Sequence, residues 1–293
     1  MDEIVITNAV GICADGLSED NSIVRGKSFY FGKIDKEFPE IDDEKYNLRC
    51  NRILKYLADK MDLSGYEKDD IAVVIGTTNS GIEEFETSDN KHHAELGNPA
   101  EFLQKYLGLN NYAASVSTAC TSGIKAFAAA RRLLENDVCK AVIAGGIDTL
   151  ASMPIYGFDA LEVLSHEKTN PFSKNRSGIS IGEAGALFLL EKNKDGIKIM
   201  GIGETSDAYH SATPDPQGVQ AAEAIQIALE DAGLMPKDID YINLHGTGTI
   251  SNDLMEANAV YKVFGSGVPA SSTKPVTGHC LGAAASLSLI HIS

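Results

Sequence analysis

Residues 112–147 read YAASVSTACTSGIKAFAAARRLLENDVCKAVIAGGI, and this stretch decides the fold class. Residues 112–117 predict a short strand. Residues 123–134 are rich in alanine and carry two arginines in their last turns, which favours a helix whose charges suit its dipole. Residues 141–147 predict a buried strand, interrupted by Gly145 and Gly146 near its end. This order indicates an α/β protein, with Cys120 in the turn before the helix.

The alternation of strands and helices continues on both sides of this stretch. A second pass of similar plan begins after the turn at 193–196, although no residue-level repeat is present. We therefore expect two pseudo-duplicated halves, residues 1–195 and 196–286, each with parallel strands covered by helices. The other predicted elements are strands at 3–6, 71–76, 186–191, 197–202, 241–244 and 268–271, helices at 45–63, 217–232, 252–264 and from 282 onward, and a polar surface loop or cap at 79–93.

The bulk composition fits an ordinary globular chain and argues against several function classes. The 293 residues are 43% hydrophobic and 23% charged. A net charge of -16, from 25 basic and 41 acidic residues, argues against binding to nucleic acid or to anionic membranes. The acidic N-terminus is unlike a signal peptide, and no apolar run is long enough to span a bilayer. Five scattered cysteines do not suggest disulfides, so we expect a reducing cytoplasm.

Cys120 is the strongest candidate nucleophile. It lies in the segment STACTSG, residues 117–123, whose small side chains permit a tight turn and the close approach of a thioester. A thiol at a helix N-terminus also feels the positive end of the dipole, which favours the thiolate. The alternative is a small buried core residue, the usual fate of a free cysteine. The other cysteines are assigned to packing: Cys13, Cys50, Cys139 and Cys280.

Two histidines lie in glycine-marked turns after predicted strands of the second half. His245 opens the segment HGTGT, at the C-terminal end of a strand, where open parallel sheets place their sites. His279 ends the segment STKPVTGH, which also contains Lys274. The alternatives are a turn histidine fixed by hydrogen bonds and a solvated lysine. The glycines around His245 and the spacing from Ser272 to His279 favour a catalytic group of these three residues with Cys120.

Metal and nucleotide sites are not predicted. His92 and His93 lie in a polar loop and are expected to face solvent rather than bind a metal. The sequence contains no phosphate-binding glycine loop, because the match at 201–203 is too short to count. We therefore expect a site that needs no metal and no organic cofactor.

The segments around Cys120, His245 and His279 together resemble the β-ketoacyl synthases, the condensing enzymes of the thiolase-like superfamily. The resemblance covers residues 3–285 and implies a thiolase-like fold, two βαβ halves in an αβαβα layering, with the second half incomplete. It implies that Cys120 takes an acyl group from an acyl carrier protein. The two histidines would bind a malonyl thioester and stabilise the enolate formed as carbon dioxide leaves, and Lys274 would orient His279. The carbanion would then attack the acyl-cysteine.

The resemblance also implies roles for neighbouring residues and for partners. Thr247 and Thr249 offer hydroxyls to a pantetheine amide, and Phe158 is a further substrate-binding position. Asp253 and Glu256 match acidic positions that support the lysine, with an ordinary charged helix face as the alternative. The implied partner is an acyl carrier protein, whose phosphopantetheine carries the substrates. The implied assembly is a homodimer, with a heterodimer as the alternative.

Two elements depart from the family pattern. Residues 170–178 read NPFSKNRSG, with serine in place of both acids of Pro-Phe-Asp-x-x-Arg-Asp-Gly, and residues 182–186 read GEAGA in place of Gly-Glu-Gly-Ala-Gly. These changes favour a specialised synthase, of the kind in aryl-polyene and similar polyketide clusters, over a housekeeping fatty-acid enzyme. The rivals are an acyltransferase or decarboxylase on the same fold and a non-catalytic partner subunit. Cys120 argues against the last, because such subunits usually lack it.

The last residues are expected to be foreign to the protein. Residues 287–293 read LSLIHIS, which a common transposon adapter of sequencing libraries also encodes. A genuine short C-terminus is the alternative. The family continues into a Gly-Phe-Gly-Gly loop that supplies the second N–H of the oxyanion hole, beside that of Cys120. Without it we expect the chain as written to be poorly folded or inactive, although its full-length parent is active, since one such donor is typically worth a factor on the order of 100 to 1000 in rate.

Overall fold

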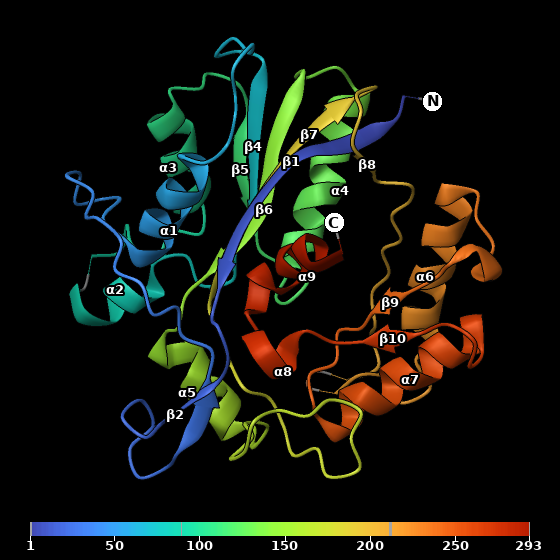
Figure 1. The fold of residues 1–293 in the computed structure, drawn as a ribbon. Coiled ribbons are helices and arrows are strands. Elements are labelled where there is room, and N and C mark those ends of the chain that lie inside the picture. The colour runs from blue at the N-terminus through green and yellow to red at the C-terminus, as the bar shows by residue number, and fades with distance from the viewer. Residues whose placement is uncertain (1, 89, 211–212, 293) are drawn as a thin grey trace.

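A six-stranded sheet forms the centre of the N-terminal half in the computed structural model, which describes residues 2–88, 90–210 and 213–292. Its strands are β1 (Ile4–Cys13), β4 (Ile71–Gly76), β5 (Ala113–Val116), β6 (Ala141–Asp148), β7 (Ala184–Lys192) and β8 (Ile197–Lys198). The strand order is β5-β4-β6-β7-β1-β8 (Figure 1). β4 runs parallel to β5 and β6, whereas β7 is antiparallel to β6 and β1. The parallel part contains the strand–helix–strand stretch on which the α/β prediction rests.

Helices cover both faces of this sheet because alternate residues of its central strands point to opposite sides. On one face, residues of β4 and β6 pack with α1 (Arg49–Ala58) and α3 (Asn98–Leu107). On the other face, the intervening residues pack with α4 (Ser122–Glu135) and with α9 (Ala284–Ile292). Figure 1 shows these two helix layers on opposite sides of the strands. The predicted α/β class is confirmed.

The C-terminal half contains a smaller lobe. α6 (Val219–Ala232) packs against α7 (Ile250–Phe264), and β9 (Ile242–Asn243) runs parallel to β10 (Ala270–Ser271). Figure 1 shows this lobe, in orange, on the α4 and α9 side of the large sheet. Its helices match the prediction closely, whereas its strands are much shorter than those of the first half.

The strand predicted at 197–202 is mostly absent. Only β8 forms there, and it pairs antiparallel with β1 in the first sheet instead of opening the second. The segment that follows lies against α6, so that a Cβ on Gly201 would be 2.2 Å from the carbonyl oxygen of Ala228. A ladder of hydrogen bonds requires a neighbouring strand, and this segment has a helix beside it.

The described residues of the stretch 79–93 contain a helix where a surface loop or cap was expected. This helix is α2 (Ile82–Ser88), and His93 is only 6% exposed. A hydrogen bond of 2.9 Å joins Nδ1 of His93 to the hydroxyl of Ser88, which explains how a polar ring is tolerated inside. The prediction that His93 faces solvent is therefore wrong, whereas His92 is exposed.

The remaining elements connect these parts. They are β2 (Ser18–Asp20), β3 (Phe29–Phe31), α5 (Ser152–Ala160), η1 (Pro236–Asp238), α8 (Lys274–Thr277) and η2 (Leu281–Ala283). Within the described ranges, no helix has both the length and the apolar character needed to cross a membrane.

Charged side chains join α4 to the C-terminal half. Arg131 of α4 pairs with Asp231 of α6, and Lys125 and Arg132 both pair with Glu204. We call these five residues the α4–α6 seam. Each of the five keeps part of its side chain in contact with solvent. Ion pairs therefore join α4 to the C-terminal half, whereas apolar contacts form the core of the first half.

Candidate active site

Cys120 lies in a tight turn between β5 and the N-terminus of α4. Ala119, just before it, has a φ of 55°, in the left-handed region that residues with a side chain rarely adopt. The hydroxyl of Ser122 accepts a hydrogen bond from the N–H of Thr118 (2.9 Å) and donates one to the carbonyl of Ala119 (2.6 Å). These bonds close the turn and present the thiol at the start of α4.

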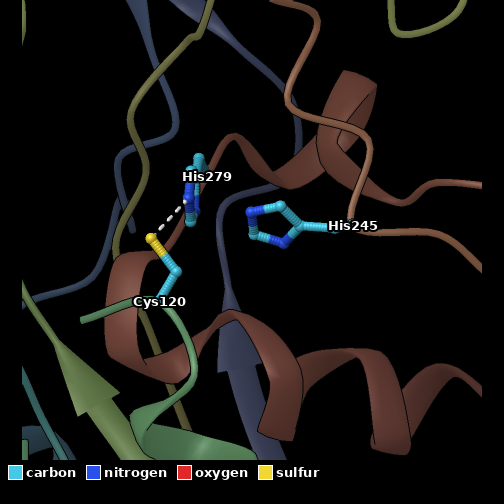
Figure 2. Close-up of side chains that lie close together, drawn as sticks. All are labelled: Cys120, His245 and His279. Atoms are coloured by element: carbon cyan, nitrogen blue, oxygen red, sulfur yellow. Dashed lines mark hydrogen bonds between the residues drawn. The ribbon is translucent and has the colours of Figure 1, made fainter. Parts of the chain in front are cut away.

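His279 reaches Cys120 from the turn after α8. Its Nε2 lies 3.1 Å from Sγ of Cys120 (Figure 2). The backbone N–H of Leu281 donates to the other ring nitrogen, Nδ1, at 3.2 Å. Because a nitrogen that accepts from a backbone N–H carries no proton, the neutral ring has its proton on Nε2. His279 therefore points an N–H at the sulfur.

His245 completes the group from the loop after β9. Its ring meets that of His279 edge to face, with centroids 5.1 Å apart and planes at 87° (Figure 2). The sulfur of Cys120 and one nitrogen of each ring lie within 4.8 Å of one another. The N–H groups of His245 and Gly246 donate to the carboxylate of Glu256 on α7, at 2.5 and 2.8 Å. Three segments that are far apart in sequence thus meet at one point.

Lys274 supplies a buried charge beside the histidines. It belongs to α8, is 3% exposed, and donates from Nζ to the carbonyl oxygen of His245. Burial lowers the pKa of Lys274, whereas the carboxylate of Glu256 raises it. The lysine ties the His245 loop to the helix that leads into His279, and its protonated form gives the site a positive potential.

Both histidines are neutral at neutral pH. Burial, followed by the charge of Lys274, lowers the pKa of His245 from 6.5 to about 3. The same causes hold the pKa of His279 well below its usual value. His245 keeps some accessible surface, but its ring is enclosed closely enough for desolvation to dominate. Neutral imidazole N–H groups suit negative charge that develops on a carbonyl oxygen.

The thiolate of Cys120 does not gain the net stabilisation expected from the helix dipole. Burial raises the pKa of Cys120, and this outweighs the lowering by Lys274 and by a backbone N–H. Because α4 begins at Ser122, the sulfur lies just outside the first turn of the helix, and burial is the larger influence on its pKa. The raised pKa favours the thiol form of Cys120, and the N–H of His279 points at its sulfur.

The predicted substrate-binding residues occupy different surroundings. Thr247 is 5% exposed, and its hydroxyl lies 3.0 Å from that of Thr249. The hydroxyl of Thr249 also accepts from the N–H of Asn252 at 3.2 Å and so caps α7, a role that the sequence analysis did not foresee. Phe158 is partly buried and packs against an apolar cluster that includes Phe29, at the edge of a core.

Asp253 holds a loop more directly than it supports the lysine. Its carboxylate is 1% exposed and accepts from the N–H groups of Phe172 (2.7 Å) and Gly248 (3.1 Å). It also pairs with Arg176 at 3.4 Å. Asp253 therefore ties the turn after His245 to the segment 170–178, which departs from the family pattern. Sequence reasoning missed Arg176, although an arginine retained in an element that had lost both its acids was a signal.

The same three side chains could also hold a metal ion. Within the described part of the chain, one group places three possible metal-ligand atoms within 4.8 Å of one another: Cys120, His245 and His279. A thiolate and two imidazoles are zinc ligands elsewhere. Lys274 argues against a cation here, because its positive charge acts on all three groups. The arrangement suits an anion better.

Family models match nearly the whole chain. The model described as "Beta-ketoacyl synthase, N-terminal domain" matches residues 32–196, and the one described as "Beta-ketoacyl synthase, C-terminal domain" matches residues 197–293. A 3-oxoacyl-[acyl-carrier-protein] synthase 2 from Coxiella burnetii is 37% identical over 195 residues, or 60% of this chain and 47% of the relative. Nodulation protein E from Rhizobium leguminosarum bv. trifolii is 36% identical over 197 residues, or 63% and 49%. The chain thus spans about half the length of these curated relatives.

Solved structures show the same likeness. A chain from the complex of the ketosynthase ApeO with its chain length factor ApeC, from Xenorhabdus doucetiae, has a TM-score of 0.94 and 36% identity, covering 99% of this chain and 83% of that one. A β-ketoacyl synthase from Burkholderia phymatum STM815 has a TM-score of 0.87 over 100% and 85% of the two chains, and at 24% identity it shows the fold alone. The expected thiolase-like fold is confirmed. With family models that match residues 32–293, the chain belongs to the β-ketoacyl synthase family.

Proposed function

We propose that the protein is a condensing enzyme that joins an acyl group held on Cys120 to a malonyl group held on an acyl carrier protein. The observation that carries this proposal is the 3.1 Å contact between His279 Nε2 and Cys120 Sγ, with a nitrogen of His245 within 4.8 Å. Family membership and the names of the relatives support the same reaction class.

The first step is a thioester exchange. The thiol of Cys120 gives up its proton, the sulfur attacks the carbonyl carbon of the acyl thioester, and the carrier's pantetheine leaves as a thiol that takes up the proton. The N–H of His279 stabilises charge on the sulfur as it develops. The result is an acyl-cysteine and a free carrier protein.

The second step forms the carbon–carbon bond. The malonyl thioester loses carbon dioxide, and the electron pair of the broken bond forms an enolate. The two neutral histidines donate hydrogen bonds to the enolate oxygen, where one donor is typically worth a factor on the order of 100 to 1000 in rate. The enolate carbon then attacks the acyl carbonyl, the carbon–sulfur bond breaks, and the Cys120 thiolate takes up a proton.

Mass spectrometry of the products tests this proposal. With acyl- and malonyl-loaded carrier protein, we expect a β-ketoacyl carrier two carbons longer than the starter. A decarboxylase would release carbon dioxide without this product, and an acyltransferase would load Cys120 without extending the chain. Cys120→Ala should abolish loading, whereas the matched variant Cys139→Ala removes a remote, buried thiol and should not. Product formation by Cys120→Ala would overturn the proposal and favour a non-catalytic subunit.

A paired assembly is part of the proposal, as are an acyl carrier partner, the absence of a metal or organic cofactor, and a cytoplasmic location. The Xenorhabdus doucetiae neighbour was solved as a ketosynthase with its chain length factor, which supports pairing. Light scattering should give twice the 31.2 kDa mass of one chain for a homodimer. If the chain pairs only when it is co-expressed with a second synthase subunit, the assembly is a heterodimer. A chain that is monomeric both alone and after co-expression contradicts a paired assembly.

A further inference from the structure

Asp148, the last residue of β6, is a buried carboxylate that receives hydrogen bonds from two separate loops. It is 0% exposed. Its Oδ1 accepts from the hydroxyl of Thr77 (2.8 Å) and from the N–H groups of Thr78 and Asn79 (2.9 Å each). Its Oδ2 accepts from the hydroxyl of Thr78 (2.8 Å) and from the N–H of Gly282 (2.6 Å). One carboxylate thus links the loop after β4 to the turn after His279.

The turn that Asp148 holds is strained. Leu281 has a φ of 47°, a left-handed conformation that costs a residue with a side chain on the order of 1 kcal/mol or more. Such a conformation persists only where its surroundings hold it. Here the N–H of Leu281 donates to Nδ1 of His279, and the next N–H along the chain, that of Gly282, donates to Asp148. The two bonds hold the peptide groups on either side of Leu281.

The close packing of this turn shows that it has little room to move while the bond is intact. A Cβ on Gly282 would lie 2.7 Å from Oδ2 of Asp148, and a Cβ on Gly123 would lie 2.6 Å from the carbonyl oxygen of Gly282. Gly123 belongs to the first turn of α4, three residues after Cys120. The turn is therefore held between the end of β6 and the start of the nucleophile's helix.

We propose that Asp148 is a positioning residue: by holding the Leu281–Gly282 peptide, it keeps the proton of His279 on Nε2, where it faces Cys120. If this anchor is lost, Leu281 can relax to a negative φ and withdraw its N–H from Nδ1. The ring would then be free to carry its proton on either nitrogen. The molecules with the proton on Nδ1 would present a lone pair to the sulfur instead of a donor.

The consequence for the reaction rests on the proposed function. A His279 without its Nε2 proton cannot donate to the thiolate or to the enolate oxygen, so the chemical step slows while carrier binding is unaffected. Asp148 is fully buried, and its effect is transmitted through the two peptide groups around Leu281 and through the imidazole ring of His279.

The variant Asp148→Asn tests the proposal, with Thr77→Val as its matched control. Asparagine keeps the size of the side chain but offers one acceptor oxygen instead of two. Valine at 77 removes a bond to the same carboxylate, and also the acceptor for the N–H of Ser80, without changing the Gly282 side. Nitrogen-15 NMR of the imidazole of His279, recorded without substrate, distinguishes the two tautomers.

We expect a single Nε2–H tautomer in the parent protein and in Thr77→Val, and a mixture in Asp148→Asn. We also expect kcat of Asp148→Asn to fall about 10- to 100-fold with KM nearly unchanged. A single Nε2–H tautomer in Asp148→Asn would overturn the proposal, whatever its activity. A mixture of equal extent in Thr77→Val would also overturn it, because the effect would then be a general loosening.

Two further results keep this test decisive. If Asp148→Asn does not fold, amide hydrogen exchange in the parent protein decides: strong protection of the Leu281 and Gly282 amides supports the anchor, and rapid exchange of either overturns it. If no form of the protein makes a condensation product, the proposed function fails. The tautomer of His279 can still be read in that case, so the two failures are distinguishable.

Discussion

The two halves of the chain hold their functional groups by different physical means. In the N-terminal half, β6 is buried along its whole length, and the rings of Phe127 and Phe188 stack edge to face at 4.9 Å beside it. In the C-terminal half, β9 is partly buried, β10 is exposed, and α6 buries only Ala222 and Leu229 among its residues. Cys120 comes from the first half, whereas His245 comes from the second.

The difference shows how a lightly packed lobe can still place a side chain accurately. Glu256 holds the backbone of His245, Asp253 holds the turn that follows, and Lys274 bonds the carbonyl of His245. Each of these three side chains is charged and largely enclosed, so each bond is stronger than its counterpart in water. Apolar packing of α4 against the sheet supports the turn that carries Cys120, whereas charge-assisted hydrogen bonds position His245.

The largest effect that should separate the two halves is on stability. Phe127→Ala removes a ring that is 1% exposed and stacked on another, and it should lower the free energy of unfolding by about 3–5 kcal/mol. Leu229→Ala, on α6 with 8% exposure, should cost about 2 kcal/mol, the lower end for such a change. Urea unfolding followed by circular dichroism measures both. Equal losses of unfolding free energy in the two variants would contradict the inference that the N-terminal half is more tightly packed than the C-terminal half.

Sequence reasoning succeeded where structure follows from local pattern. The run at 141–147 became a fully buried strand because a stretch without polar residues is stable only with both faces covered. The alanine-rich run became α4 because its residues favour a helix. Cys120, His245 and His279 were grouped because each stands in a glycine-marked turn at the end of a strand, and the structure brings them together.

Other features depended on contacts that no local pattern reveals. The strand expected at 197–202 needed a neighbouring strand and received a helix. His93 was placed in solvent because its neighbours are polar, but those neighbours satisfy its ring in the interior. Asp148 was missed because its partners Asn79 and Gly282 are 69 and 134 residues away. An acid at the end of an otherwise apolar strand was the available signal.

The next effect in size concerns the charge that links the two histidines. Lys274→Met removes the donor to the His245 carbonyl and one of the two causes that lower the pKa of His245. We expect kcat to fall about 100- to 1000-fold. The pKa of His245 should rise from about 3 but stay below its ordinary value, because burial, the larger cause, remains. NMR titration of the ring measures the shift.

Lys262→Met is the control for Lys274→Met. Lys262 lies on α7 in the same half and is exposed, so its loss removes one positive charge without touching the site. It should leave kcat and the titration of His245 unchanged. If both variants shift the pKa of His245 equally, the shift comes from the net charge of the protein. The local contact with Lys274 would then not explain the lowered pKa of His245.

The smallest effect is expected at the α4–α6 seam, where the two halves meet through partly exposed charges. Asp231→Asn breaks the pair with Arg131 and should lower the free energy of unfolding by about 0.2–1 kcal/mol at low salt, with little loss in 1 M salt. The pair with Arg131 lowers the pKa of Asp231 below 3.8, so its stabilisation is complete above that pH and is lost as the pH falls through the lowered value. Glu135→Gln removes a pair of the same guanidinium within α4 and should cost about 0.2–0.5 kcal/mol, with no effect across the seam. An Asp231→Asn protein as stable as the parent in low salt would mean that the halves are joined by other contacts, and that the ionic character of the seam is incidental.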